Sequence, residues 1–141
     1  NLRNANLSGA NLRNANLSGA DLSDVLYNEF TAFLSMQCPS EGSFIAWKKT
    51  NGFIIKLEIT KNSKRSSATT LKCRCSEAKC LAIENIEGSN AGIKSIASGY
   101  DRNFIYQIGE ICKVDDFDED RWSECSAGIH FFISREMAVK Y

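Results

Sequence analysis

The first 25 residues repeat with a strict period of five, and no other feature limits the fold of this chain as much. Leu occupies the second position of each repeat, and Ala occupies the fifth until Val25 replaces it in the last one. An α-helix would spread these apolar residues around its axis, and a β-strand would need strict alternation. A fixed short repeat is instead typical of a coil in which successive units stack on one another.

The repeats NLRNA, NLSGA, NLRNA, NLSGA and DLSDV resemble the pentapeptide-repeat family, whose motif is A-(N/D)-L-x-x. The resemblance implies a right-handed quadrilateral β-helix over residues 1–25, with one repeat on each face and four in each coil. Leu and Ala would fill the axis, Asn and Asp would bond backbone at the corners, and Arg3 and Arg13 would face solvent. The sequence begins inside a repeat and holds little more than one coil, so we expect further coils upstream.

The charges of the remaining chain are segregated although the net charge is zero. Residues 48–82 contain nine Lys or Arg against two acidic residues, whereas residues 83–124 contain four against ten. Regions of opposite sign attract each other within one fold or between copies, which argues against a nucleic-acid partner for the basic region. No apolar stretch approaches a membrane span and no signal peptide precedes the repeats, so we expect no membrane contact and a cytoplasmic location.

Residues 26–37 are expected to form a helix that caps the open end of the repeat coil. Leu26, Phe30, Phe33 and Leu34 follow helical spacing, and the predicted helix ends before Pro39, the only proline of the chain. The domain that follows, residues 38–141, is predicted to be β-rich with an α+β fold. With 43% hydrophobic and 24% charged residues, the chain has the composition of a globular protein.

Several segments of residues 38–141 have clear local patterns. Asn51-Gly52 separates two aromatic and β-branched runs, 43–49 and 53–60, and this arrangement predicts a β-hairpin. Alternation in the second run predicts a strand buried on one face only. Further strands are expected within 71–86, within 104–114 with a bend at Gly109, and through 129–133, followed by a short helix capped by Ser134. Residues 61–70 and the acidic run 115–120 are predicted to be loops.

Residues 38–141 carry a second resemblance, through SFIAWKK, KRSSATTLKCRCSEAK and DFDEDRWSECSAGIHFF. They resemble an uncharacterised domain found behind pentapeptide repeats in bacterial and phage proteins. The segments 72–75 and 125–131 are also similar to parts of a phage rapid-lysis protein. The resemblance implies no activity, so we expect a non-catalytic binding or protein-interaction module on a repeat scaffold, phage-related, whose partner is another protein or a second copy.

Two alternatives rest on the cysteines and the single histidine. Cys73, Cys75, Cys125 and His130 are the ligand types of a tetrahedral zinc site, which would make the domain a zinc-stabilised assembly unit. Buried or free thiols explain the same cysteines without a metal. Cys125 and His130 could also form a nucleophile and its general base in an enzyme. Apart from this zinc we expect no cofactor.

A further alternative comes from Gly128-Ile129-His130-Phe131, followed by Ser134 and Tyr141. This segment resembles the NAD-binding strand and helix of the poly-ADP-ribose polymerase family, with His130 in place of the motif's tyrosine. The resemblance implies a nucleotide-binding or ADP-ribosyltransferase-like domain. The candidate ligand-binding residues on this hypothesis are Arg65, Cys75, Arg121, His130 and Tyr141.

Overall fold

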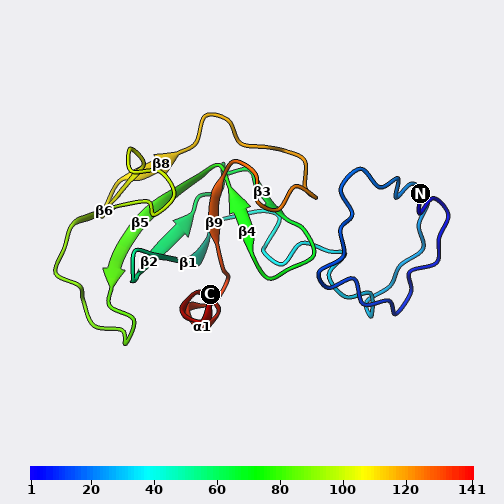
Figure 1. The fold of residues 1–141 in the computed structure, drawn as a ribbon, viewed down its shortest axis with the longest axis horizontal. Helices are drawn as coiled ribbons and strands as arrows, with labels where there is room; N and C mark the ends of the chain where they lie inside the picture. Colours follow the sequence, from blue (N-terminus) through cyan, green and yellow to red (C-terminus); the bar gives the residue numbers. More distant parts are fainter.

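A computed structural model describes all residues, 1–141, as a repeat segment at one end of the molecule and a β-rich domain at the other (Figure 1). In chain order the elements are β1 (Phe44–Thr50), β2 (Phe53–Ile59), β3 (Arg65–Ser67), β4 (Cys73–Cys75), β5 (Glu77–Glu84), β6 (Ser95–Ala97), β7 (Ile105–Gln107), β8 (Ile111–Lys113), β9 (Ile129–Phe131) and α1 (Arg135–Lys140). They form a four-stranded sheet β1-β2-β5-β8, a three-stranded sheet β3-β4-β9 and a two-stranded sheet β6-β7. None of its helices has the length and apolar character that a membrane span requires.

The predicted hairpin is confirmed as β1 and β2. Thr50 pairs with Phe53, so the turn consists of Asn51 and Gly52 alone, and their φ angles are +49° and +82°. Positive φ at both central residues matches the right-handed twist of the flanking strands, which is why Asn-Gly favours this turn. The turn fixes the register of the hairpin and therefore which side chains share a face.

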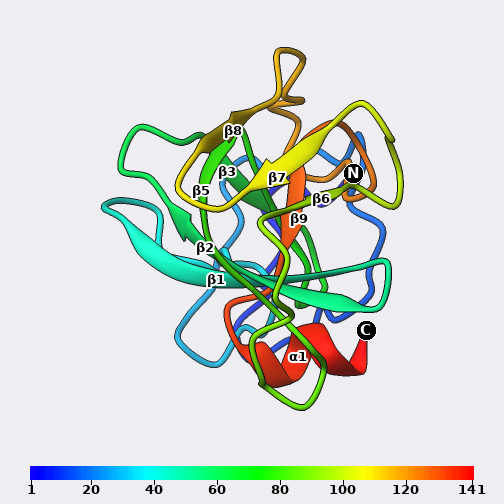
Figure 2. The same ribbon diagram turned by 90° about the vertical axis from the view of Figure 1, so that its left-hand side faces the viewer.

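The strand β2 is buried along one face, as predicted, and on its other face Ile54 is buried while Lys56 and Glu58 are half-buried. Ile55, Leu57 and Ile59 belong to the main core beneath the sheets. On the opposite face Ile54 packs in a smaller cluster with Phe132 and Ala138 of α1. Figure 2 shows α1 beneath the β1–β2 hairpin, with β6 and β7 on the other side. The helix therefore covers this face at Ile54, a contact that the alternation within β2 alone does not reveal.

The expected strand over 104–114 is divided at Gly109 into two strands of different sheets. Gly109 has a φ of +90°, so the predicted bend at this glycine is confirmed. β7 pairs with β6, whereas β8 pairs with the edge of β5. The bend therefore carries the chain from the two-stranded sheet to the four-stranded one.

Each repeat of residues 1–25 closes its own turn. The N–H of the fifth residue donates to the carbonyl of the second, as in Ala5 to Leu2 at 2.9 Å and Ala10 to Leu7 at 2.9 Å. The leading Asn or Asp accepts from the N–H two residues on, as Asn1 does from Arg3 at 2.9 Å. The fourth residue has positive φ throughout, which Asn, Gly and Asp tolerate. The period of five is thus the period of a local turn.

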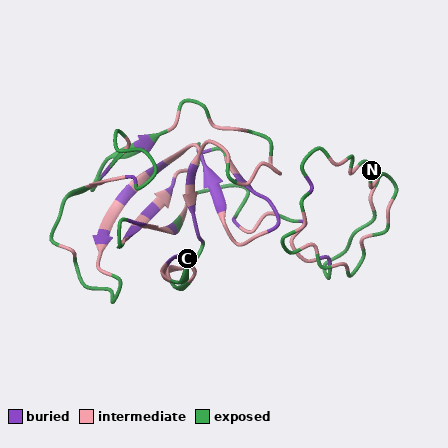
Figure 3. Ribbon diagram, viewed as in Figure 1, coloured by how far each residue is buried: buried purple, intermediate pink, exposed green.

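Successive layers of the repeat segment pair about 20 residues apart. Leu2 N–H donates to the Asp21 carbonyl at 3.0 Å, and Leu7 N–H donates to the Leu26 carbonyl at 2.7 Å. Only the segment after Asp21 forms a second layer, so residues 1–25 do not build a closed β-helix by themselves. Figure 3 shows the consequence, since most buried residues lie in the β-rich domain and few in the repeat segment.

The expected capping helix over 26–37 is absent, and the chain continues the coil instead. The Leu26 and Ala32 backbones pair with the first coil, and Asn28 accepts from the Phe30 N–H at 3.1 Å like the leading Asn of a repeat. Phe33 has a φ of +65°, which a helix excludes. Pairing with the coil satisfies the backbone groups that a helix would have satisfied internally, and Phe30 stays 70% exposed.

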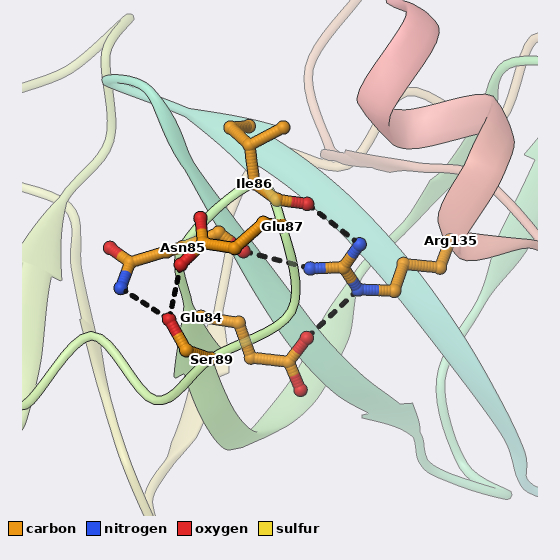
Figure 4. A network of polar contacts seen from close by, with 6 residues as sticks. All are labelled: Glu84, Asn85, Ile86, Glu87, Ser89 and Arg135. Atoms are coloured by element: carbon orange, nitrogen blue, oxygen red, sulfur yellow. Dashed lines mark hydrogen bonds and ion pairs between the residues drawn. The ribbon is translucent and has the colours of Figure 1, made fainter.

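Two arginines fasten loops around the domain. Arg135 of α1 donates to Glu84 Oε1 at 2.9 Å and to the carbonyls of Asn85 and Ile86 at 2.8 and 3.0 Å, which holds α1 against the end of β5 (Figure 4). Arg74 of β4 is 1% exposed, and its guanidinium donates to the carbonyls of Asp118, Ala127 and Asp120 at 2.8–3.0 Å. Arg74 thus fixes the acidic loop whose far end borders the candidate site.

Candidate functional site

A pocket of about 670 Å³ lies where the end of β1, the loop before β7 and the chain around β9 meet. Its lining includes Lys48, Lys72, Cys125, His130 and Tyr141. This volume is in the range of small-ligand sites. A second hollow of about 520 Å³ lies between Arg13 and α1, and of the candidate residues only Tyr141 borders it. The larger pocket is therefore the better candidate site.

Lys48 is the unusual residue of this pocket. The hairpin register places it opposite Ile55, so Lys48 lies on the core-facing side of β1 between Ala46 and Thr50. Its Nζ donates to the His130 carbonyl at 3.1 Å, and no carboxylate forms an ion pair with it. Burial lowers the pKa of Lys48 to about 8, and the nearby charge of Lys72 acts in the same direction.

Lys48 is not among the site residues predicted from the sequence, although the sequence contains the information that places it. The turn Asn51-Gly52 fixes the pairing of β1 with β2, and Ile55 is on the predicted buried face. Residues directly opposite in an antiparallel pair point to the same side of the sheet. Combining these two inferences would have placed the Lys48 ammonium group among apolar side chains.

Lys72 contacts two of the predicted site residues, Tyr141 and Cys125, at the pocket. Its Nζ lies 3.3 Å from the Tyr141 hydroxyl and 3.9 Å from Cys125 Sγ. The Tyr141 ring packs on Phe132 with 5.1 Å between centroids, although Tyr141 remains 70% exposed. Lys72 thus adds a second positive charge to the same pocket.

His130 contributes a neutral imidazole to the wall of the pocket. Its Nε2 lies 3.0 Å from the Ser126 carbonyl, so this nitrogen carries the proton and donates. Burial lowers the pKa of His130, and the positive charges of Lys48, Lys72 and Arg74 lower it further against the effect of this hydrogen bond. His130 forms no hydrogen bond with Cys125, so the expected nucleophile and base are not paired in this structure.

The four expected zinc ligands are not brought together. Cys73 and Cys75 alternate with Arg74 along β4 and point into the core, where both are fully buried. Burial raises the pKa of the Cys75 thiol to about 12, which opposes the thiolate form that zinc requires. Cys125 and His130 line the pocket instead. No group of three or more His, Cys, Asp or Glu side chains in the structure could hold a metal ion.

Arg65 and Arg121 serve the backbone of the domain and do not line the pocket. The Arg65 guanidinium donates to the carbonyls of Gly42 and Thr60, both at 2.8 Å. Arg121 donates to the Ser67 carbonyl at 2.6 Å and to the Leu34 carbonyl. Of the five residues expected to bind a nucleotide, only His130 and Tyr141 line the pocket.

Comparison with known proteins agrees with the division of the chain into repeats and domain. Residues 1–25 match the pentapeptide repeats (8 copies), and residues 34–138 match a family described as a family of unknown function (DUF5758). Neither the curated proteins nor the solved structures gave a match to the chain. Because residues 34–138 are most of the 141 residues, the chain belongs to the DUF5758 family, preceded here by pentapeptide repeats.

Proposed function

We propose that the chain is a non-catalytic binding module on a pentapeptide-repeat scaffold, and that its pocket binds a carboxylate group. The observation that carries this proposal is the amine of Lys48, which lines a pocket and has no acidic partner. Removing a charged group from water is costly unless a counter-charge compensates it. A carboxylate in the pocket would compensate Lys48 directly.

The charges of the pocket support this proposal. Three lysines line it, Lys48, Lys49 and Lys72, against the two carboxylates of Asp101 and Asp116. The carboxylate has two sources, a small organic acid or an acidic segment of a partner protein. An acidic segment accords with the expected role in protein interaction, and the phage-related setting rests on the sequence resemblance alone. All six cysteines are unpaired, which agrees with a reducing compartment such as the cytoplasm.

We also propose that further repeats would continue the coil as a right-handed quadrilateral β-helix, with the repeat segment of this chain extending to Ala32. The return of the chain after about 20 residues supports four repeats per coil. In such a rod the domain would sit at the end of a stiff spacer, which presents the pocket at a distance from whatever the rod is attached to.

The test is a titration of the protein at pH 7 with succinate and, separately, with a short Glu-rich peptide, followed by NMR and calorimetry. We expect saturable binding of at least one of them, with shifts at His130 and Tyr141. Lys48→Met should weaken binding about tenfold or more, since it removes one charge-assisted contact. Lys113→Met is the matched control, because Lys113 is exposed on β8 and does not line the pocket.

The two arms distinguish the source of the carboxylate. Tighter binding of the peptide would indicate a protein partner, and equal binding of succinate would indicate a small acid. Absence of binding at millimolar concentration, or the same loss in Lys48→Met and Lys113→Met, would contradict the proposal.

A nucleotide is a second candidate ligand, favoured by the placement of two aromatic residues at the same pocket. Tyr141 and the fully exposed Tyr100 border the pocket that contains the three lysines. A base could stack on one tyrosine while its phosphates contact lysine. Titration with ADP-ribose under the same conditions tests this candidate, and quenching of tyrosine fluorescence would be the expected signature.

A further inference from the structure

We infer that the pocket captures a small oxo acid covalently, with the Lys48 amine condensing with its aldehyde or ketone carbon and Lys72 holding its carboxylate. This inference rests on the proposed carboxylate site and names the ligand class of that same site. It concerns a single reversible capture step and requires no turnover.

The Lys48 amine is held in place at the wall of the pocket. It makes one hydrogen bond, to the His130 carbonyl at 3.1 Å, and lines a pocket of about 670 Å³. A donated N–H bond to a carbonyl holds the amine in place and leaves its lone pair free of protein partners. The amine is therefore both fixed and accessible from the pocket.

The Lys48 amine is partly unprotonated near neutral pH. Only an unprotonated amine can attack a carbonyl carbon, and an ordinary lysine is almost wholly protonated at neutral pH. Burial lowers the pKa of Lys48 to about 8, so a substantial fraction of this amine is unprotonated near pH 7.5. Burial and a neighbouring cation are the two means by which a lysine is made nucleophilic.

Lys72 is the neighbour of Lys48 that can hold the carboxylate of a ligand. The Lys72 charge contributes to the low pKa of Lys48, and Lys72 lines the same pocket. Lys72 Nζ donates to the Tyr141 hydroxyl at 3.3 Å and forms no ion pair, so its charge is available to a ligand carboxylate. A neutral aldehyde would use Lys48 alone, whereas an oxo acid would use both lysines.

The chemical step is balanced without an oxidant or a reductant. The nitrogen lone pair forms a bond to the carbonyl carbon and gives a carbinolamine. The two amine hydrogens then leave with the former carbonyl oxygen as water, and a C=N double bond remains between Lys48 and the ligand. Hydrolysis reverses the step, so the complex persists only while the ligand is present or until the double bond is reduced.

The test uses the whole chain with glyoxylate as probe and sodium cyanoborohydride as reductant, followed by peptide mapping of every modified lysine. At pH 7.5 we expect Lys48 to be modified at least about tenfold faster than the exposed Lys113, because burial lowers the pKa of Lys48 to about 8 and leaves a substantial fraction of its amine unprotonated. The rate at Lys48 should not rise further above about pH 8, because its amine is then already largely unprotonated. Equal rates at the two lysines would overturn the inference.

The variant Lys72→Met separates oxo acid capture from simple amine reactivity. Both glyoxylate and acetaldehyde depend on the Lys48 amine, but only glyoxylate carries a carboxylate. We expect the ratio of the glyoxylate rate to the acetaldehyde rate at Lys48 to fall about fivefold or more in Lys72→Met. An unchanged ratio would overturn the assignment of an oxo acid.

The proposed function and this inference fail in different ways. If succinate or the acidic peptide binds but Lys48 is modified no faster than Lys113, the carboxylate site stands and covalent capture is wrong. If no carboxylate binds, the proposed function is wrong. If the ratio of the glyoxylate rate to the acetaldehyde rate is also unchanged in Lys72→Met, the assignment of an oxo acid as ligand is wrong as well.

Discussion

At the scale of single residues, two cations on the strands of the domain, Arg74 and Lys48, differ in how their charges are accommodated. The Arg74 guanidinium donates to three carbonyls, and its central carbon lies 5.1 Å from the centroid of the Phe117 ring. Lys48 has a single carbonyl acceptor and an open pocket beside it. The difference separates a residue that fastens a loop from a residue that is available to a ligand.

Replacing Lys48 by Met should stabilise the protein near neutral pH. The pKa of Lys48 is about 8 in the folded chain against 10.5 ordinarily, so between these values the unfolded state binds more protons and stability rises with pH. Below pH 8 the folded state bears the full energetic cost of burying the charged Lys48 amine. We expect Lys48→Met to raise the free energy of unfolding by roughly 1–3 kcal/mol at pH 7 and to lose most of this advantage by pH 10.5. Urea unfolding at both pH values measures it, and an equal gain at both would contradict the assigned pKa.

Among the six cysteines, only Cys125 is exposed. We expect a thiol reagent such as dithionitrobenzoate to modify one cysteine rapidly in the folded protein and all six after unfolding in urea. The variant Cys125→Ser should show no rapid phase, whereas Cys112→Ser should retain it. Rapid modification of Cys73 or Cys75 would show that the core opens more readily than its packing implies.

At the scale of elements, local sequence determined the hairpin and the repeat turns, but not the segment between them. The Asn51-Gly52 turn and the five-residue turns are closed by pairing within a few residues, so the residues that specify each turn are neighbours in the chain. Residues 26–37 had helical spacing, yet their backbone pairs with residues about 20 positions earlier. Tertiary pairing overrides local propensity when it satisfies the same backbone groups and covers the end of a coil.

The hairpin turn offers a direct test at this scale. Gly52 has a φ of +82°, and a Cβ added there would meet no heavy atom within 4 Å, so Gly52→Ala is opposed by backbone conformation alone. We expect Gly52→Ala to lower the free energy of unfolding by about 1 kcal/mol. Gly52→Asn should cost less, because Asn tolerates positive φ. Thermal unfolding of the two variants gives the comparison, and an equal cost would show that the turn conformation is not what limits stability.

At the scale of the whole molecule, the repeat segment and the domain are joined by hydrogen bonds. Thr69, between β3 and β4, donates its hydroxyl to the Ala15 carbonyl at 2.6 Å and accepts from the Asn14 N–H at 2.9 Å through its own carbonyl. Arg121 donates to the Leu34 carbonyl, just beyond the end of the coil at Ala32. The two hydrogen bonds of Thr69 therefore hold the coil against the domain.

Removing the Thr69 hydroxyl should loosen this junction. We expect Thr69→Val to lower the free energy of unfolding by about 1–2 kcal/mol, because the Ala15 carbonyl loses its partner, and to speed hydrogen exchange at the Asn14 amide. Thr60→Val is the matched control, since the buried Thr60 hydroxyl has no hydrogen-bond partner and its removal should be neutral or stabilising. Similar losses in both variants would show that shape, not the hydrogen bond to the coil, accounts for the effect.

The candidate site was only partly accessible from the sequence. Cys125, His130 and Tyr141 were each candidate site residues on separate hypotheses, and the structure brings these three to one pocket. Arg65 and Arg121 were candidate ligand-binding residues, but nearby carbonyls occupy their guanidinium groups. Sequence shows which groups can bind an anion, whereas the neighbours that already occupy them come from distant parts of the chain.

The sequence alone determined the turns of the repeats, the hairpin, the final helix with its Ser134 cap and the order of repeats and domain. Each of these depends on residues close together in the chain. Tertiary structure decided that residues 26–32 extend the coil, that Ile54 of β2 is buried against α1 and that Cys73 and Cys75 lie in the core. It also placed Lys48 in a pocket. These outcomes depend on which distant backbone groups and apolar faces meet, because burial and pairing are satisfied by the whole chain and not by any one segment.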